Sequence, residues 1–314
     1  MPPLLIIEKL SIAAPLGVCF HDAATGERVT GGLNVSVYPD SQRLEKDNRK
    51  NRTFAFPNRR GVYVLHKARG LKNFPFGEGD AQFWNDNPPQ KLYVAEVFDT
   101  ERRFQPFYFT VKLPVKGIYK WQNIPASSPN KNISSIPLYS APARKVSDGM
   151  SVIRAHLRRV DDKPASWAVL EARLGGNLVA RGIADRDGQI ALIFPSLPPQ
   201  NNPIASPPEA AASVSLAEQK WMLDLTVKYQ PGIFQSSPPN STESDEEVFP
   251  DLRLALAQAE GKLWTDAGQT EEFKTAVLQF GKELILRPRK SEILSPMSDE
   301  ASARSSFLFI SPAV

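Results

Sequence analysis

The chain has 314 residues, of which 41% are hydrophobic and 23% charged, values typical of a soluble globular protein. A net charge of +4 is too small to make nucleic acid the expected partner, and a single cysteine, Cys19, excludes an intrachain disulfide framework and a multi-cysteine metal site. The 28 prolines favour short strands and linkers over long helices.

The N-terminal sequence "MPPLLIIEKLSIAAPLGV" has an apolar run with no basic region before it, so we expect no secretory signal. No apolar run approaches the roughly 18 residues that a membrane-spanning helix needs, and we expect no direct membrane span. The lone cysteine fits a reducing compartment.

Residues 1–115 are predicted to form an N-terminal β-sandwich domain. In "GGLNVSVYP", Leu33, Val35 and Val37 alternate with polar residues, which is typical of a half-buried strand. Similar short runs cover 62–65, 92–98 and 107–113, separated by turns rich in Pro, Gly and Asn.

Two features of this half suggest contacts with a partner. Arg43–Lys72 holds ten Lys or Arg residues and two acids, which is typical of either a solvated loop or a face that binds an acidic partner. Pro75–Pro89 reads as a long surface loop, and we predict a protein-contact patch there. The aromatic residues of this predicted patch are Phe74, Phe76, Phe83 and Trp84. Other aromatics of this half, Phe54 and Phe56 among them, are expected to pack in the core or in loops rather than to stack on nucleic acid or sugar.

The remainder of the chain divides by composition. Residues 116–142, rich in Pro, Ser and Asn, are predicted to be a linker that is partly packed through Trp121, Ile136 and Tyr139, and 143–287 a second β-sandwich domain. Within it, "KWMLDLTVKY" alternates cleanly and gives the strongest strand prediction. The insert 235–248 has four acids and no base and reads as a disordered acidic loop.

The C-terminal part is less clearly patterned. Asp251 is predicted to cap a short helix, and the sequence leaves open whether 251–287 is helical or completes the second sandwich. Residues 288–314 are predicted to form a C-terminal arm. Its apolar end, Phe307, Leu308, Phe309 and Ile310, is expected to bind a partner by adding as a strand to a neighbouring subunit.

The stretch "ADRDGQ" resembles part of a calcium loop. An EF-hand loop has its glycine sixth and a bidentate acid twelfth, whereas here the glycine is fourth and the residues after it are apolar. We therefore predict a hairpin turn in which Asp187 and Gly188 supply the positive φ angles of a type I′ turn.

No residue pattern indicates a catalytic centre. His21, His66 and His156 lack metal-binding spacing, no Gly-x-Ser-x-Gly motif is present, and Cys19 lies in an apolar run. We expect no catalytic residues, no metal site and no cofactor.

Two resemblances add to these predictions. "SWAVLEARLGGNLVARGIADRDGQIALIFP" followed by "KWMLDLTVKY" resembles the carboxypeptidase regulatory-like (transthyretin-like) β-sandwich, in which a D-x-x-G turn precedes a rising apolar strand. Asp185, Asp187 and Gly188 match the turn. The resemblance covers 150–230 and, more loosely, 20–115. It implies a mainly β chain with two Ig/transthyretin-like sandwich domains.

The whole chain also resembles an accessory protein of contractile injection systems, the phage-tail-like particles of bacteria. The resembling segments are Phe20–Val35, Phe104–Gly117 and Pro137–Leu157. This resemblance implies a non-enzymatic component of the baseplate region that is present in several symmetric copies and contacts other subunits of the particle. It also implies that the protein is made in the bacterial cytoplasm, and that the assembled particle is then released or anchored to a membrane. The alternative is a β-sandwich protein that binds a surface polysaccharide through the loop aromatics around Trp84.

Overall fold

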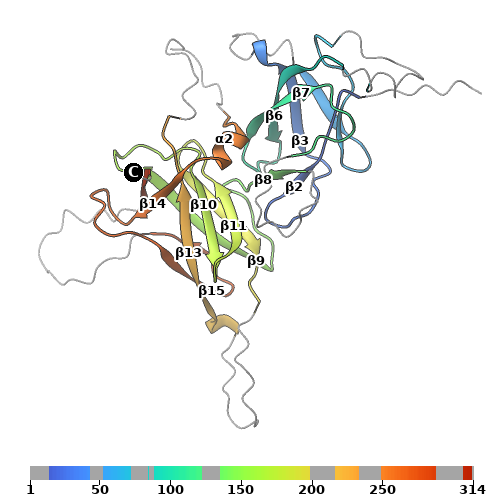
Figure 1. Cartoon of the computed structure of the whole chain (residues 1–314). Coiled ribbons are helices and arrows are strands. Elements are labelled where there is room, and N and C mark those ends of the chain that lie inside the picture. Colours follow the sequence, from blue (N-terminus) through green and yellow to red (C-terminus); the bar gives the residue numbers. More distant parts are fainter. Residues whose placement is uncertain are drawn as a thin grey trace, which may run out of the picture. The chain divides into compact units, whose positions relative to one another are not determined.

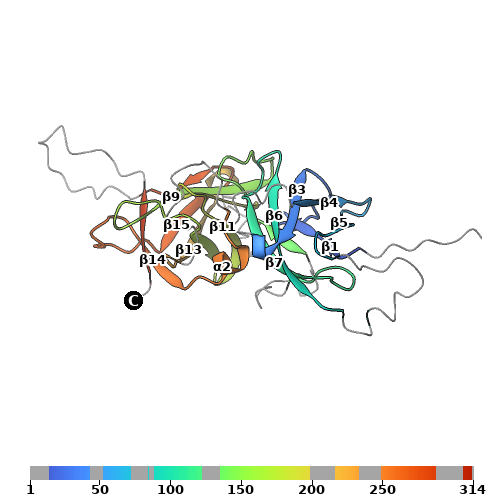
Figure 2. The ribbon, with the colours of Figure 1, turned by 90° about the horizontal axis from the view of Figure 1, so that it is seen from above.

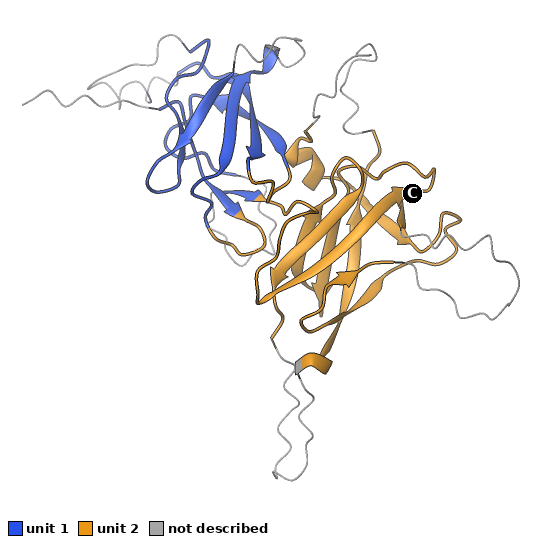
Figure 3. Cartoon of the chain, turned by 180° about the vertical axis from the view of Figure 1, so that it is seen from behind, with its two compact units in different colours: residues 1–21, 28–100, 106–137 blue, residues 22–27, 101–105, 138–314 orange. Residues whose placement is uncertain are grey.

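The computed structural model describes residues 14–42, 52–71, 84, 88–121, 135–198, 216–232, 249–287 and 307–312. The chain forms two compact units (Figure 3). Unit 1 comprises Met1–His21, Arg28–Thr100 and Pro106–Pro137; unit 2 comprises Asp22–Glu27, Glu101–Gln105 and Leu138–Val314.

Unit 1 is built on a six-stranded antiparallel sheet in the order β1-β5-β4-β3-β6-β7. Its strands are β1 (Leu16–Val18), β3 (Leu33–Pro39), β4 (Thr53–Pro57), β5 (Tyr63–Leu65), β6 (Lys91–Asp99) and β7 (Phe107–Leu113), with a 3-10 turn at Asp40–Gln42. The strands predicted at 33–37, 62–65, 92–98 and 107–113 are confirmed within a residue or two.

The sheet of unit 1 curls around its own core. Side chains that alternate along the strands, such as Val35, Tyr93 and Phe109, are buried on the inner face. After β7 the backbone returns to β1: the Val115 N–H donates to the Pro15 carbonyl (2.9 Å) and the Tyr119 N–H donates to the Gly17 carbonyl (2.7 Å). This closure buries one face of every strand.

A small two-stranded sheet pairs β2 (Phe20–Asp22) with β8 (Ile136–Leu138). The three residues through which the linker 116–142 was expected to pack, Trp121, Ile136 and Tyr139, are all buried, and the C-terminal end of the linker forms β8. The predicted domain boundaries also need correction, since 101–105 belongs to unit 2, where the Gln105 N–H donates to the Tyr139 carbonyl (2.8 Å). Most of the predicted linker, 122–134, lies outside the described residues.

Unit 2 contains a nine-stranded curled sheet. Its helical segments are the 3-10 turn Leu216–Glu218 and α2 (Leu252–Leu256). Its strands are β9 (Met150–Arg159), β10 (Val169–Leu174), β11 (Asn177–Ile183), β12 (Gln189–Pro195), β13 (Lys220–Lys228), β14 (Glu260–Trp264), β15 (Thr275–Gln279), β16 (Leu284–Ile285) and β17 (Leu308–Pro312). The order is β11-β10-β13-β14-β17-β9-β12, with β15 also on β13 and β16 also on β9 (Figure 1).

The strands of unit 2, which Figure 2 shows from above, contribute side chains to one hydrophobic core. Along β13, Trp221, Leu223, Leu225 and Val227 are buried and alternate with polar or exposed residues. They share one hydrophobic cluster with residues of β9 and β12, such as Leu192. The fold-class prediction is confirmed: the chain is mainly β, with curled, sandwich-like sheets.

Residues 251–287 complete the second sheet rather than forming a helical subdomain. Asp251 caps the single turn of α2, as predicted, by accepting the backbone N–H groups of Arg253 and Leu254. The chain then forms β14, β15 and β16. None of the helices in the described parts of the chain is long and apolar enough to cross a membrane.

The two glycine turns of the 166–195 stretch differ from each other. Gly175 and Gly176 both have positive φ and close a two-residue hairpin between β10 and β11, since Leu174 pairs with Asn177. At the second turn only Gly188 has positive φ, so the predicted type I′ geometry with Asp187 is wrong. There the Asp185 carboxylate accepts the backbone N–H groups of Asp187 and Gln189, and β12 pairs with β9 instead of β11.

Candidate interaction surface

Two aromatic side chains of β4 are exposed to solvent. Phe54 is 44% exposed and Phe56 is 63% exposed, whereas Ala55 between them is buried in the core of unit 1. Phe54 pairs with Ser36 of β3, and Phe56 pairs with Val64 of β5. We call Phe54, Phe56 and the half-buried Val64 the β4 aromatic surface.

The local sequence explains why this surface is exposed. In "TFAFP" successive residues point to opposite faces of the strand, so Phe54 and Phe56 lie on one face and Ala55 on the other. β4 lies inside the sheet, where its first half, Thr53–Ala55, pairs with β3 and its second half, Phe56 and Pro57, pairs with β5. After it, the Asn58 side-chain carbonyl accepts the N–H groups of Arg60 (2.9 Å) and Val62 (3.1 Å) and fixes the turn into β5.

A polar network lies immediately beside the aromatic pair. Arg52 Nη1 lies 2.8 Å from Glu96 Oε2, and the Tyr38 hydroxyl donates to Glu96 Oε1 (2.6 Å). The Arg52 guanidinium also lies over the Tyr38 ring, 5.3 Å from its centroid. The network joins Tyr38 of β3 and Glu96 of β6 to Arg52, which immediately precedes β4.

The charges around this surface are basic. Arg59 and Arg60 are exposed in the turn that follows β4, and Lys67 is exposed just beyond β5. We call these three residues the basic rim. The negative charge of Glu96 is compensated by Arg52. The described part of the basic stretch predicted from the sequence therefore contributes exposed cations next to exposed aromatic rings.

The predicted aromatic patch lies mostly outside the described residues. Phe74, Phe76 and Phe83 fall there, and Trp84 alone is described, with a half-buried side chain. Sequence reasoning missed Phe54 and Phe56, which were expected to pack inside. The sequence signal that could have indicated their exposure is the small alanine between the two phenylalanines. A small residue fits against a closely packed core more easily than two aromatic rings do.

The predicted C-terminal contact residues have a different location from the one expected. Phe309 is 7% exposed, and Leu308 and Ile310 are almost fully buried. They belong to β17, which pairs with β14 on one side and β9 on the other. The apolar end of the predicted arm is therefore a strand of the unit 2 sheet, with Leu308 and Ile310 in the core of that unit.

Unit 2 contains a buried carboxylate surrounded by cations. Glu171 of β10 is 1% exposed and forms ion pairs with Arg173 (2.8 Å), Arg181 of β11 (2.7 Å) and Lys228 of β13 (3.2 Å). Burial alone would raise the pKa of Glu171, but the charge of Arg181, the hydrogen bond from Arg173 and the charge of Lys228 outweigh it and lower the pKa. The cluster joins three adjacent strands.

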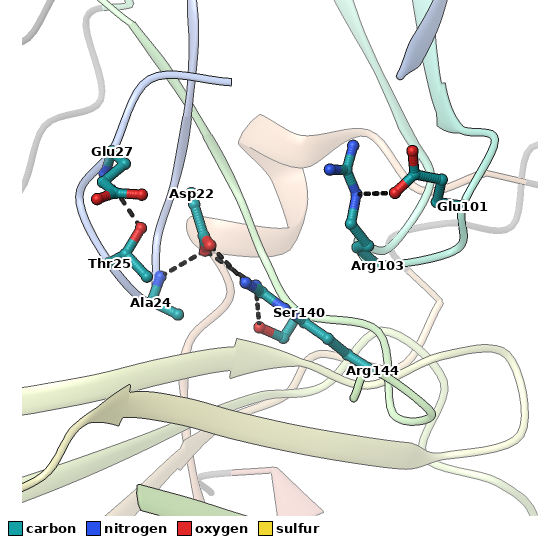
Figure 4. Close-up of polar contacts among 8 residues, drawn as sticks. All are labelled: Asp22, Ala24, Thr25, Glu27, Glu101, Arg103, Ser140 and Arg144. Carbon is teal, nitrogen blue, oxygen red and sulfur yellow. Dashed lines mark hydrogen bonds and ion pairs between the residues drawn. The ribbon is translucent and has the colours of Figure 1, made fainter. Parts of the chain in front are cut away.

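A second ion pair, between Asp22 and Arg144, links the short segment 22–27 to the rest of unit 2. Figure 4 shows the Arg144 guanidinium meeting both oxygens of Asp22, with Nη1 3.0 Å from Oδ1 and 3.0 Å from the Ser140 hydroxyl. The Asp22 carboxylate also accepts the Ala24 N–H (2.8 Å). Arg144 in addition lies over the Phe104 ring, 4.9 Å from its centroid. Segments far apart in sequence are thus tied together within unit 2.

Two candidate nucleophiles are buried. His21 Nδ1 lies 2.8 Å from the Ser135 hydroxyl, but Ser135 is only 7% exposed. Cys19 is 2% exposed, and burial raises the pKa of its thiol, with a smaller opposing effect from Arg28. In the described parts of the chain, no three His, Cys, Asp or Glu side chains lie close enough together to hold a metal ion.

Comparison with known proteins adds little to this geometry. No family model and no curated protein matches the chain. It is weakly similar to the TIE protein of Bacillus anthracis, with 10% identity and a TM-score of 0.21 over 85% of this chain and 44% of that one. The chain thus spans less than half the length of that protein. A candidate adhesin of Bacteroides ovatus gives 9% identity and a TM-score of 0.15 over 68% of this chain and 78% of that one.

Proposed function

We infer that this protein is a non-enzymatic assembly component that acts through protein–protein contacts made by the β4 aromatic surface. The observation that supports this most strongly is the pair of exposed rings, Phe54 and Phe56, on an interior strand in which Phe54 pairs with β3 and Phe56 with β5. Large aromatic side chains dominate the binding energy of many interfaces, and exposed apolar patches commonly mark contact sites.

The basic rim indicates the kind of partner. Arg59, Arg60 and Lys67 lie beside the rings, so a complementary surface would present apolar side chains at its centre and carboxylates at its edge. Burying the two rings against apolar groups supplies affinity, whereas the charges at the edge steer association and orient the partner.

The proposed setting is a bacterial contractile injection system, near its baseplate and in several symmetric copies. Support for it comes from the resemblance of Phe20–Val35, Phe104–Gly117 and Pro137–Leu157 to an accessory protein of those particles. Each of these segments contains a point at which the chain passes between the two units. In this proposal the protein is made in the bacterial cytoplasm and leaves it only with the particle.

The alternative proposal is polysaccharide binding by the loop aromatics, of which only Trp84 is described. The two proposals predict opposite results in a glycan-binding assay. An assembly component shows no saturable binding to polysaccharide, whereas a polysaccharide-binding protein loses such binding when Trp84 is replaced by alanine.

The β4 surface is tested by replacing Phe54 and Phe56 with serine and measuring how much tagged protein co-sediments with the particles of the bacterium that encodes the chain. We expect recovery to fall at least tenfold, because each buried aromatic anchor at an interface contributes on the order of 2 kcal/mol. Circular dichroism spectra of the variant should match those of the unchanged chain, since both rings are exposed.

The chain offers a matched control on unit 2. Met222 is 64% exposed and Val277 is 38% exposed, and the two residues pair directly between β13 and β15. Replacing both with serine removes a similar exposed apolar pair without touching β4. Equal losses in the two double variants would show that the effect is not specific to the β4 aromatic surface and would overturn the assignment.

A further inference from the structure

The C-terminal strand occupies an interior position in the sheet of unit 2. β17 pairs antiparallel with β14, from Gly261–Pro312 to Trp264–Phe309, and parallel with β9, from Leu308–Leu157 to Ile310–Arg159. We call the space between these two strands the C-terminal slot. Without β17, both β14 and this part of β9 would expose unpaired backbone groups, which readily bind another extended strand.

Within the described residues, several contacts join 307–312 to the walls of the slot. Leu308 and Ile310 enter the core, and the Phe307 ring lies 3.8 Å from the Arg158 guanidinium and 4.5 Å from the His156 ring. The Trp264 indole N–H donates to the Ser311 hydroxyl (2.9 Å). None of these contacts requires that strand and slot belong to the same chain.

The connection to the strand is much longer than the gap it has to cross. β16 and β17 follow each other along β9 in the same direction: Ile285 pairs with Arg154 and Leu308 pairs with Leu157. Two residues would be enough to cover the two intervening positions of β9. The chain instead places 22 residues between Ile285 and Leu308, which can span up to about 70 Å when extended.

We propose that the C-terminal slot also accepts β17 of a second copy of this chain, so that neighbouring copies exchange their last strands. Because 22 residues separate β17 from β16, β17 can leave the slot without pulling β16 away from β9. The long connection then lets it reach the slot of a neighbour. This exchange uses unit 2 and does not depend on the β4 aromatic surface.

The local protein concentration determines whether β17 occupies the slot of its own chain or the slot of a neighbouring copy. A tether of about 20 residues holds the strand near its own slot at an effective concentration of roughly 1 mM, so dilute chains keep their own strand. Copies packed side by side in an assembly present their slots to one another at a comparable local concentration. Exchange is therefore expected where several copies are held together.

Two single-cysteine variants of the full chain test this directly. Lys262 of β14 pairs with Ser311 of β17, so cysteines at these two positions lie opposite each other on adjacent strands. One variant carries Lys262→Cys and the other Ser311→Cys, and the two are mixed with oxidised glutathione as the oxidant. A disulfide between these positions can form only between chains, and peptide mapping by mass spectrometry distinguishes it from any bond to Cys19.

We expect dimers linked through positions 262 and 311 to be scarce at about 10 μM and abundant at about 1 mM, because exchange competes with the tethered strand. The double variant with both cysteines in one chain should close internally at every concentration, since strand and slot are then in register. Failure of the double variant to close would overturn the register on which the proposal rests. Absence of linked dimers in the concentrated mixture would overturn the exchange itself.

A donor-side control separates exchange from random collision of exposed thiols. Adding Ile310→Asp to the Ser311→Cys chain places an unpaired carboxylate where a buried isoleucine enters the core. We expect linked dimers to fall at least tenfold. An unchanged yield would show that the cross-link forms without insertion of the strand, and the proposal would then be wrong.

Discussion

Gly188 lies at a point where the backbone has no room for a side chain. Its φ angle is +79°, and a Cβ there would overlap the carbonyl oxygen of Leu157 and lie 3.2 Å from the Ala165 nitrogen. The Gly188 carbonyl also accepts the Leu157 N–H (2.8 Å). The glycine of the D-x-x-G turn therefore permits the close approach of the turn to β9.

We expect Gly188→Ala to lower the free energy of unfolding by about 2–4 kcal/mol, from backbone strain together with steric overlap. Urea denaturation followed by circular dichroism measures this loss. Gly176→Ala is the matched control, because Gly176 has a φ of +81° and a Cβ added there would meet no described atom within 4 Å. Strain alone should cost about 1 kcal/mol there, and equal losses at both sites would contradict the crowding at Gly188.

At single residues, the sequence alone does not determine which face of a strand is covered or which type of turn forms. The alternation in "TFAFP" places Phe54 and Phe56 on one face of a strand, but it does not say which face the rest of the molecule covers. Similarly, Asp187-Gly188 is a frequent pair in type I′ turns, yet the Asp185 carboxylate fixes a different turn by accepting two N–H groups.

Among the elements, the strands with alternating hydrophobic and polar residues were the most predictable, although β3 and β7 also bury Ser36 and Tyr108 of their other face. The runs 33–37, 107–113 and 221–229 alternate strictly, and an alternating pattern needs only local sequence to be recognised. The pairing of β17 could not be predicted, because its partners β14 and β9 lie about 50 and 150 residues away. The same holds for β8, whose partner β2 lies near the start of the chain.

Glu171 couples three strands and makes the stability of unit 2 depend on pH. The pKa of Glu171 is lowered in the folded chain, so the unfolded chain binds more protons as the pH falls through the unfolded value of about 4.3. The stability that the ion pairs contribute is present above that pH and is lost as the pH falls toward the lower, folded pKa.

We expect the free energy of unfolding of the unchanged chain to decrease on acidification and that of Glu171→Gln to decrease less. Urea titrations at a series of pH values measure both slopes. Glu283→Gln is the control, because Glu283 pairs with Arg154 at the surface, where ion pairs contribute little. Parallel slopes for all three proteins would mean that Glu171 does not carry the pH dependence.

At the scale of the whole molecule, the two-part organisation was visible in the sequence but its boundaries were not. Composition marked 116–142 as a linker. In the structure, two short segments from the first half of the chain, 22–27 and 101–105, belong to unit 2. Such segments are assigned by long-range contacts, including the Asp22–Arg144 ion pair and the Ala141–Arg103 backbone hydrogen bond. Sequence composition carries no information about contacts between residues so far apart.

We propose that this chain is a subunit of a multi-protein particle, and quantitative mass spectrometry of particles purified from the organism that encodes it can establish this. We predict that peptides of this chain stay in a fixed ratio to the sheath and tube subunits through successive purification steps, at a copy number that fits the symmetry of the particle. Purified, intact particles that lack the chain, with all of it recovered in the soluble fraction, would show that the chain is not one of their subunits.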